Sequence, residues 1–142
     1  MASILKVDEL RGIVSAGDIT VTSEGGAATQ SLQQGLAKAF VSFKGTSTVT
    51  VHDSQNVSSV SDLDTGRYRP NFTNSMSNDT YSPSGGCFDS GENGANGTYI
   101  SIYTDGGSTM ATGFLSLSTR EHSGGGRYDV TQANLTVHGD LA

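Results

Sequence analysis

The sequence predicts an all-β fold: a C-terminal antiparallel β-sandwich or jelly-roll-like domain, preceded by an extended N-terminal segment and one short helix. Apolar and polar residues alternate with a period of two through most of the chain, as in strands that bury one face. Turn-forming residues, including 19 Gly, interrupt these runs at short intervals. With 142 residues, 34% of them hydrophobic, the chain can bury one modest core. We expect an N-terminal region of residues 1–40 and a sandwich of residues 41–142.

The first element is an extended leader over residues 1–28. Ile19 and Val21 alternate there with two threonines, which is typical of a strand or a hairpin. The Gly-rich residues 24–28 then predict a flexible break.

A short helix is predicted over residues 29–39. Ser31 and Gln34 have the spacing of a capping box. Apolar residues four apart form one narrow stripe: Leu32, Leu36 and Phe40. Gly35 weakens the helix by about 1 kcal/mol, and so short a helix is marginal in water, so the stripe needs a partner surface. Either it packs on the sheet of its own chain, or three copies of it pack around a common axis. The position of the helix in an extended N-terminal region favours the second arrangement.

From residue 39 onward the pattern is that of strands. Val41 and Phe43 alternate with polar residues, and a later strand has one apolar face made of Tyr68, Pro70 and Phe72. Because proline cannot donate to a ladder, Pro70 places that strand at a sheet edge or a bulge.

The remaining strands are separated by turns. One opens at Tyr81 and ends at a turn over residues 83–86, and two more cover residues 99–104 and 113–119. The last covers residues 128–138, with a bulge near residue 132 where the apolar parity changes. About eight short strands at close spacing indicate a sandwich or jelly roll.

Charge and hydropathy argue against several partners. The net charge is −6 and the 8 basic residues are scattered along the chain, whereas nucleic-acid binding requires clustered Lys and Arg. No stretch approaches the roughly 20 apolar residues of a membrane helix, and charges interrupt the apolar N-terminus. We therefore expect no nucleic acid, no membrane insertion and no signal peptide, and synthesis in the cytoplasm.

Residues suited to catalysis or metal binding lack the required arrangement. His52, Asp53 and Ser54 are consecutive, and consecutive strand residues point to opposite faces, so they cannot form a catalytic triad. Cys87 has no partner cysteine and is predicted to be a small buried residue at a strand start. We expect no enzyme activity, no cofactor and no metal site. Calcium at the loop of residues 85–97 and a carboxylate pair acting on a glycan stay open as alternatives.

Four segments of the sequence carry a family resemblance: MASILKVDEL, ATQSLQQGLAKAF, GTSTVTVHDSQNVSSV and DLDTGRYRPNFTNSMSNDTY. In this order they resemble tail-fibre proteins of tailed bacteriophages, in particular a short fibre module of marine cyanophages. The resemblance covers residues 1–81 and is specific as a set. One departure is Arg69-Pro70, where the module usually carries small or β-branched residues.

The resemblance implies a virion structural protein, a phage tail fibre or part of one, that mediates attachment to the host surface. In this interpretation the chain forms a homotrimer in the virion tail, with trimer contacts at Leu32, Leu36 and Phe40. Its N-terminal segment docks to other phage tail or baseplate proteins, and the sandwich faces a host surface glycan or protein. The residues expected to contact that receptor are Tyr99, Tyr103, Tyr128, Asp89 and Asn93.

Two other functions stay open. A capsid decoration or head-fibre protein is one, because 142 residues are few for a complete fibre. A carbohydrate-acting or lectin-like module is the other.

Overall fold

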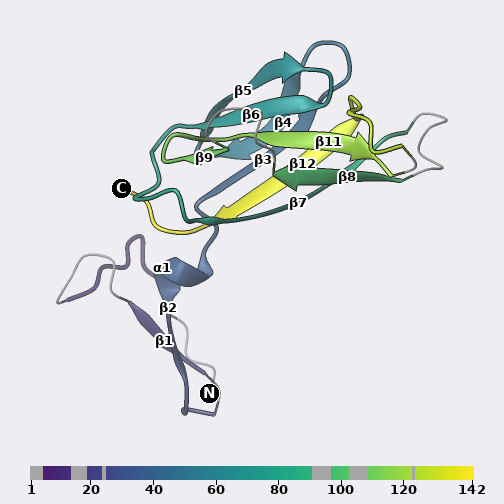
Figure 1. Ribbon diagram of the computed structural model, residues 1–142. Coiled ribbons are helices and arrows are strands. Elements are labelled where there is room, and N and C mark those ends of the chain that lie inside the picture. Colours follow the sequence, from purple (N-terminus) through teal and green to yellow (C-terminus); the bar gives the residue numbers. More distant parts are fainter. Residues whose placement is uncertain (1–4, 14–18, 24, 91–96, 103–108, 123) are drawn as a thin grey trace. The chain divides into compact units, whose positions relative to one another are not determined.

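A computed structural model describes residues 5–13, 19–23, 25–90, 97–102, 109–122 and 124–142. The chain divides into two compact units, unit 1 ending at Leu36 and unit 2 beginning at Ala37, rather than after residue 40 as expected. Nearly all regular structure is strand, as the sequence predicted (Figure 1).

Unit 1 is built around a hairpin. Its strands, β1 (Thr20–Thr22) and β2 (Thr29–Ser31), are antiparallel. The Ser23 N–H donates to the Ala28 carbonyl at 2.9 Å, and Gly26 adopts φ 68°, a left-handed conformation that glycine takes without strain. Residues 25–28, expected to belong to a flexible break, therefore lie in the turn of this hairpin.

The helix α1 (Leu32–Gly35) is a single turn, far shorter than predicted. The residues before the helix, Thr29–Ser31, are not helical because they pair with β1 as strand β2. The Ser31 side chain makes no capping hydrogen bond. Leu36 is already extended, with φ −95° and ψ 140°. Phe40 lies in a strand of unit 2, so the predicted helical stripe of Leu32, Leu36 and Phe40 does not form. With Gly35 as its last residue, one isolated turn cannot compete with the strands on either side.

Unit 2 is an antiparallel β-sandwich of two sheets, as predicted. The smaller sheet has the order β4 (Thr50–Gln55), β3 (Ala39–Lys44), β12 (Gln132–His138) and β7 (Ser82–Phe88).

In the larger sheet, β5 (Val57–Asp64) pairs with one side of β6 (Arg67–Phe72). On the other side of β6 lie β10 (Phe114–Leu115) and β11 (Leu117–Glu121). Beyond them, β9 (Met110–Ala111) pairs with β10 and β8 (Thr98–Ile102) pairs with β11.

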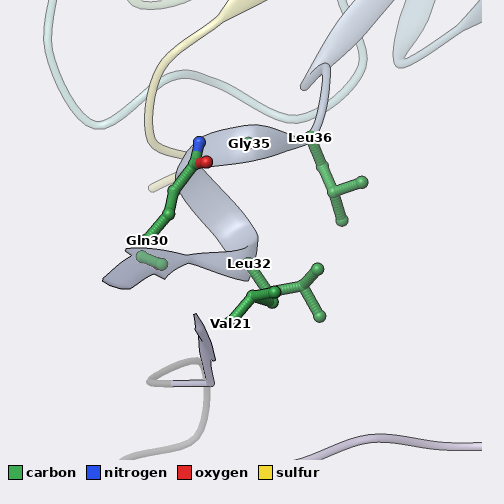
Figure 2. Close-up of a pocket in the computed structure, with 6 residues that line it drawn as sticks. Val21, Gln30, Leu32, Gly35 and Leu36 are labelled. Atoms are coloured by element: carbon green, nitrogen blue, oxygen red, sulfur yellow. The ribbon is translucent and has the colours of Figure 1, made fainter. Parts of the chain in front are cut away.

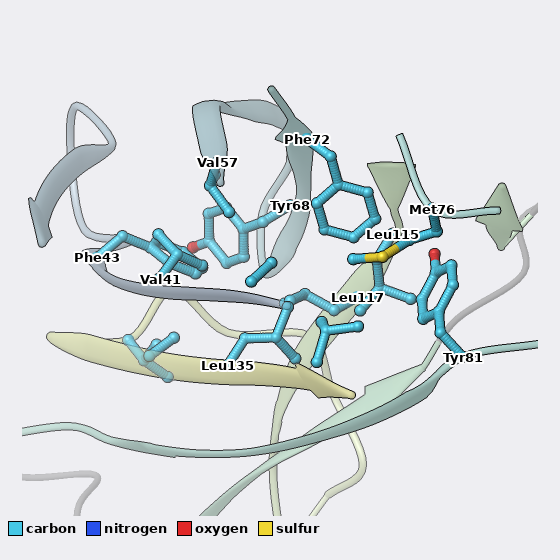
Figure 3. Packing of buried hydrophobic residues seen from close by; sticks show 14 residues of the cluster. Val41, Phe43, Val57, Tyr68, Phe72, Met76, Tyr81, Leu115, Leu117 and Leu135 are labelled. Carbon is cyan, nitrogen blue, oxygen red and sulfur yellow. The ribbon is translucent and has the colours of Figure 1, made fainter. Parts of the chain in front are cut away.

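The core lies between the two sheets (Figure 3). Its buried side chains come from alternate positions of β3, β6 and β12, including Val41, Phe43, Tyr68, Phe72 and Leu135. Phe43 meets Tyr68 edge to face at 5.1 Å between ring centroids, and Phe72 meets Tyr81 at 5.7 Å. Such aromatic pairs each add about 1 kcal/mol to the burial of their apolar area.

The two buried tyrosines are held by their hydroxyl groups. Tyr68 donates to Asp129 Oδ1 at 2.7 Å, and the same oxygen accepts the Gly66 N–H at 2.7 Å. Tyr81 donates to the Phe114 carbonyl at 2.7 Å. Burial raises the pKa of Tyr68 well above its usual range and raises the pKa of Tyr81 to about 12, because the charged phenolate is poorly solvated there.

Pro70 lies neither in an edge strand nor at a bulge, the two positions that the sequence predicted. It pairs with Val60 of β5 on one side. On the other side, the register of Tyr68 with Leu117 places Leu115 opposite Pro70, at the point where β10 ends. The strand β6 continues across Pro70, and the missing N–H coincides with the interruption between β10 and β11.

Three smaller expectations are also corrected. Residues 83–86 do not form a turn, because Pro83 lies inside β7 at the edge of its sheet, where a missing N–H is tolerated. Cys87 lies near the end of β7, half-buried, with its thiol pKa raised by burial. The final strand begins at Gln132, so the parity change there marks a strand start and not a bulge.

A single residue, Asn56, links the two sheets between β4 and β5. Its φ of 55° lies in the left-handed region, which asparagine tolerates better than most residues. Its side-chain oxygen accepts the Asn74 backbone N–H at 2.7 Å, and its amide donates to the Asn74 carbonyl at 3.1 Å. The side chain thus fixes the position at which the chain passes from one sheet to the other.

Candidate binding face

The outer face of the larger sheet carries an arrangement of arginines that strand register brings together. Along β6, Tyr68, Pro70 and Phe72 are buried in the core, so the alternating residues Arg67 and Arg69 lie on the outer face. Arg120 of β11 lies on the same face, since it alternates with Leu117 and Thr119, which are buried on the inner side.

Directly opposite residues of antiparallel strands share a face, so the register defines rows across it. In the first row, Arg120 pairs with Tyr99 of β8 on one side. On the other side its backbone forms an isolated antiparallel β-bridge with that of Arg127. In the second, Ser118 pairs with Arg67 and with Ser101.

Two further rows continue along β6. Ser61 pairs with Arg69, and beyond that pair Asn71 lies between Ser59 and Phe114. We call this surface the arginine face; its arginines are Arg67, Arg69, Arg120 and Arg127, and its other main residues are Tyr99, Asn71, Ser59, Ser61 and Phe114.

Two of the arginines are held in place by the fold. The Arg69 guanidinium lies 4.3 Å from the centroid of the Phe114 ring, and its Nε donates to Ser116 Oγ at 3.2 Å. Arg120 Nη1 donates to the Gly125 carbonyl at 2.6 Å. All four arginines are half-buried, so their stems lie along the sheet.

Hydroxyl and amide groups occupy the rest of the face. Asn71 Nδ2 donates to both Ser59 Oγ and Ser61 Oγ at 3.0 Å. Among the described residues of these rows the acidic one is Asp64, which pairs with Arg67 at the edge of the sheet. Arginines therefore outnumber carboxylates in the described rows, on a chain whose net charge is −6.

Of the residues predicted to contact a receptor, Tyr99 belongs to the arginine face and is 41% exposed. Tyr128 is half-buried and packs against the core instead. Asp89 accepts a hydrogen bond from Thr131 Oγ1 at 2.6 Å, beyond the end of β7, and does not lie in these rows. Tyr103 and Asn93 lie outside the described residues.

Sequence reasoning missed the arginines, because it took the basic residues to be scattered. Arg67 and Arg69 are far from Arg120 and Arg127 along the chain, but the pairing of β6 with β11 brings the two pairs together. The alternation of Arg67 and Arg69 with the apolar face of β6 was a usable signal for two of them. The pairing of β6 with β11, which brings in Arg120, has no local signature.

Unit 1 contains a second feature, a shallow apolar hollow of about 210 Å³. Val21, Leu32 and Leu36 line it together with Gln30, Ser31 and Gly35, and Figure 2 shows Val21 and Leu32 side by side. No described residue of unit 1 is buried, and Leu36 is 53% exposed. Two of the three predicted trimer-contact residues, Leu32 and Leu36, thus lie on one apolar surface, and Phe40 belongs to unit 2.

Among the described residues, no group of three or more His, Cys, Asp or Glu side chains is placed to hold a metal ion. Asp53 accepts the backbone N–H of Ser54 at 2.8 Å, which is the local bond of a turn-forming residue. No described helix is long and apolar enough to cross a membrane.

Comparison of the chain with models of protein families, with curated proteins and with solved structures found no match.

Proposed function

We propose that the chain is a structural protein of a bacteriophage virion, a tail fibre or part of one, that assembles through unit 1 and attaches to the host surface through the sandwich. The proposal rests on the sequence segments that resemble the fibre module and on one observation of the structure. Unit 2 has a complete core of its own, whereas the described part of unit 1 buries no residue.

A unit of this kind needs a partner surface. A two-stranded hairpin is marginally stable by itself, and one helical turn adds little. Unit 1 nevertheless exposes several large apolar residues, namely Leu5, Val7, Leu10, Ile13, Val21 and Leu36. Burying them against other copies of the same segment would stabilise each copy, at about 25 cal/mol for each Å² of apolar surface covered. We assign this role to a homotrimer, which also places Leu32 and Leu36 at the contact.

The oligomeric state tests the assembly. Light scattering of the full chain at micromolar concentration should give three times the 14.7 kDa chain mass. Leu36→Asp should shift the protein towards monomer, because it places a charge on the apolar hollow. Gln33→Asp, an exposed position of the same helical turn, is the matched control and should leave the trimer intact. A monomeric full chain would contradict the proposal.

The position in the particle tests the attachment role. A reconstruction of the intact virion should place the chain at the tail, with the sandwich outermost. Finding it on the capsid would replace the tail fibre by a capsid decoration or head-fibre protein.

A further inference from the structure

We propose that the arginine face binds an acidic polysaccharide, with the guanidinium groups holding its carboxylate or sulfate groups and the Ser and Asn side chains meeting its hydroxyls. This inference deepens the proposed function and rests on it, because it names the class of surface molecule that the sandwich would recognise. It is carried by the strand register that gathers Arg67, Arg69, Arg120 and Arg127 on one face.

The charge of the face points to an anion. Four of the five arginines of the chain lie in adjacent rows, and among the described residues of those rows the acidic side chain is Asp64. Arginine presents a planar fork of N–H donors that matches a carboxylate or sulfate with two parallel hydrogen bonds. Since successive outward residues of a strand are about 7 Å apart, neighbouring rows can contact successive groups of an extended chain.

The fold also prepares the donors before any ligand arrives. Stacking on Phe114 and the bond to Ser116 orient Arg69, and the bond to Gly125 orients Arg120. Side chains that are already ordered lose less conformational entropy when they bind, so a modest number of contacts suffices.

The surroundings of the arginines favour a polysaccharide over a nucleic acid. Ser59, Ser61 and Asn71 form a hydrogen-bonded group of hydroxyls and an amide, which is suited to sugar hydroxyls. Tyr99, beside Arg120, offers an apolar ring with a polar tip at the end of the first row. Nucleic-acid duplexes carry one charge for about every 1.7 Å, and a chain of net charge −6 repels such dense charge more than the sparser charge of an acidic glycan.

Binding to defined polymers tests the inference. The full-length protein would be titrated with alginate, which carries carboxylates, with dextran sulfate, and with neutral dextran, and binding followed by calorimetry at low and at physiological salt. We expect alginate or dextran sulfate to bind, more weakly as salt rises, and dextran not to bind. Which of the two anionic polymers binds identifies the anionic group. Absence of binding to both would overturn the inference.

Charge variants locate the site. Arg67→Gln with Arg120→Gln should weaken binding at least tenfold, since each removes charge-assisted hydrogen bonds. Lys44→Glu is the matched control: it lowers the net charge by the same two units, on β3 of the smaller sheet, and should change affinity less than twofold. Equal weakening by both variants would show that net charge alone matters and would overturn the site.

A second variant covers the case in which loss of two arginines disturbs folding. Ser59→Glu keeps every arginine and places a carboxylate at an exposed position of the face, so it should weaken binding several-fold. Thr50→Glu, exposed on β4 of the other sheet, is its control and should not weaken binding. No difference between these two variants would contradict the inference.

Two further outcomes separate the possible errors. If single-stranded oligothymidine binds more tightly than either polysaccharide and loses affinity in the Arg67→Gln, Arg120→Gln variant, the ligand is a nucleic acid and the inference is wrong. If the chain is a trimer in the virion tail but binds neither anionic polymer, this inference fails and the proposed function stands. If the face binds such a polymer but the chain is absent from the virion, the proposed function is wrong and the assignment of the binding face stands.

Discussion

Gly85 in β7 shows how tightly single residues are fitted into the smaller sheet. A Cβ at this position would lie 2.4 Å from the backbone oxygen of Asn134 and 3.3 Å from Ile100 Cδ1. The first contact is with backbone, which cannot rotate away. At the next residue, Gly86, a Cβ would meet no atom within 4 Å.

These two glycines give a matched pair of substitutions. We expect Gly85→Ala to lower the free energy of unfolding by about 2–4 kcal/mol, because β7 must shift away from β12. Gly86→Ala should change it by less than about 1 kcal/mol, with a small gain from reduced freedom of the unfolded chain. Urea unfolding of both variants measures the difference. Equal stabilities of the two would contradict the close approach at Gly85.

Single residues also show which features were accessible from the sequence alone. The buried positions Val41 and Phe43 followed from alternation, and so did the face of Tyr68, Pro70 and Phe72. Tyr99 was identified as a candidate contact because an aromatic ring stood in a clear strand. The arginines around it were missed, because their grouping depends on which strands pair, and alternation does not specify partners.

At the level of elements, the link between the sheets depends on Asn56. Two features coincide there, a left-handed backbone and a side chain that bonds to Asn74. Either could be the reason why asparagine occupies the position.

Substitution separates these two features. We expect Asn56→Ala to cost about 2 kcal/mol, since alanine loses the side-chain bonds and is strained at positive φ. Asn56→Gly should cost about 1 kcal/mol or less, because glycine accepts the backbone conformation and the freed Asn74 groups are exposed to water. Thermal or urea unfolding checks the order. If glycine cost as much as alanine, the hydrogen bonds and not the backbone conformation would dominate.

The elements that could not be predicted share a physical cause. Local propensity suggested a helix over residues 29–39, but pairing of Thr29–Ser31 with β1 left only one helical turn. Pro70 suggested an edge or a bulge, but the interruption of the neighbouring strand between Leu115 and Leu117 accommodates it in the sheet interior. In both cases a contact with a distant segment overrode the local preference.

For the whole molecule, the two buried tyrosines predict how stability depends on pH. The pKa of Tyr81 is raised to about 12 in the folded protein, and that of Tyr68 is raised further, from an ordinary value of about 10. Above pH 10 the unfolded chain therefore releases protons that the folded chain retains. This contribution to stability is complete below pH 10 and is lost as the pH rises towards 12.

Urea unfolding at pH 8, 10, 11 and 12 tests this dependence. We expect the free energy of unfolding to fall from pH 10 upward, and to fall less steeply in Tyr81→Phe, which has no phenol to ionise at that position. A free energy that stays constant between pH 10 and pH 12 would show that these tyrosines ionise as readily in the folded protein as in the unfolded chain.

The alternation along β6 has an evolutionary consequence. Tyr68, Pro70 and Phe72 point into the core, while Arg67, Arg69 and Asn71 point outward from the same six-residue strand. Mutation can therefore exchange every second residue and change what the surface recognises without altering the packing beneath it. A chain built in this way can acquire a new ligand through a few outward substitutions while its fold stays constant.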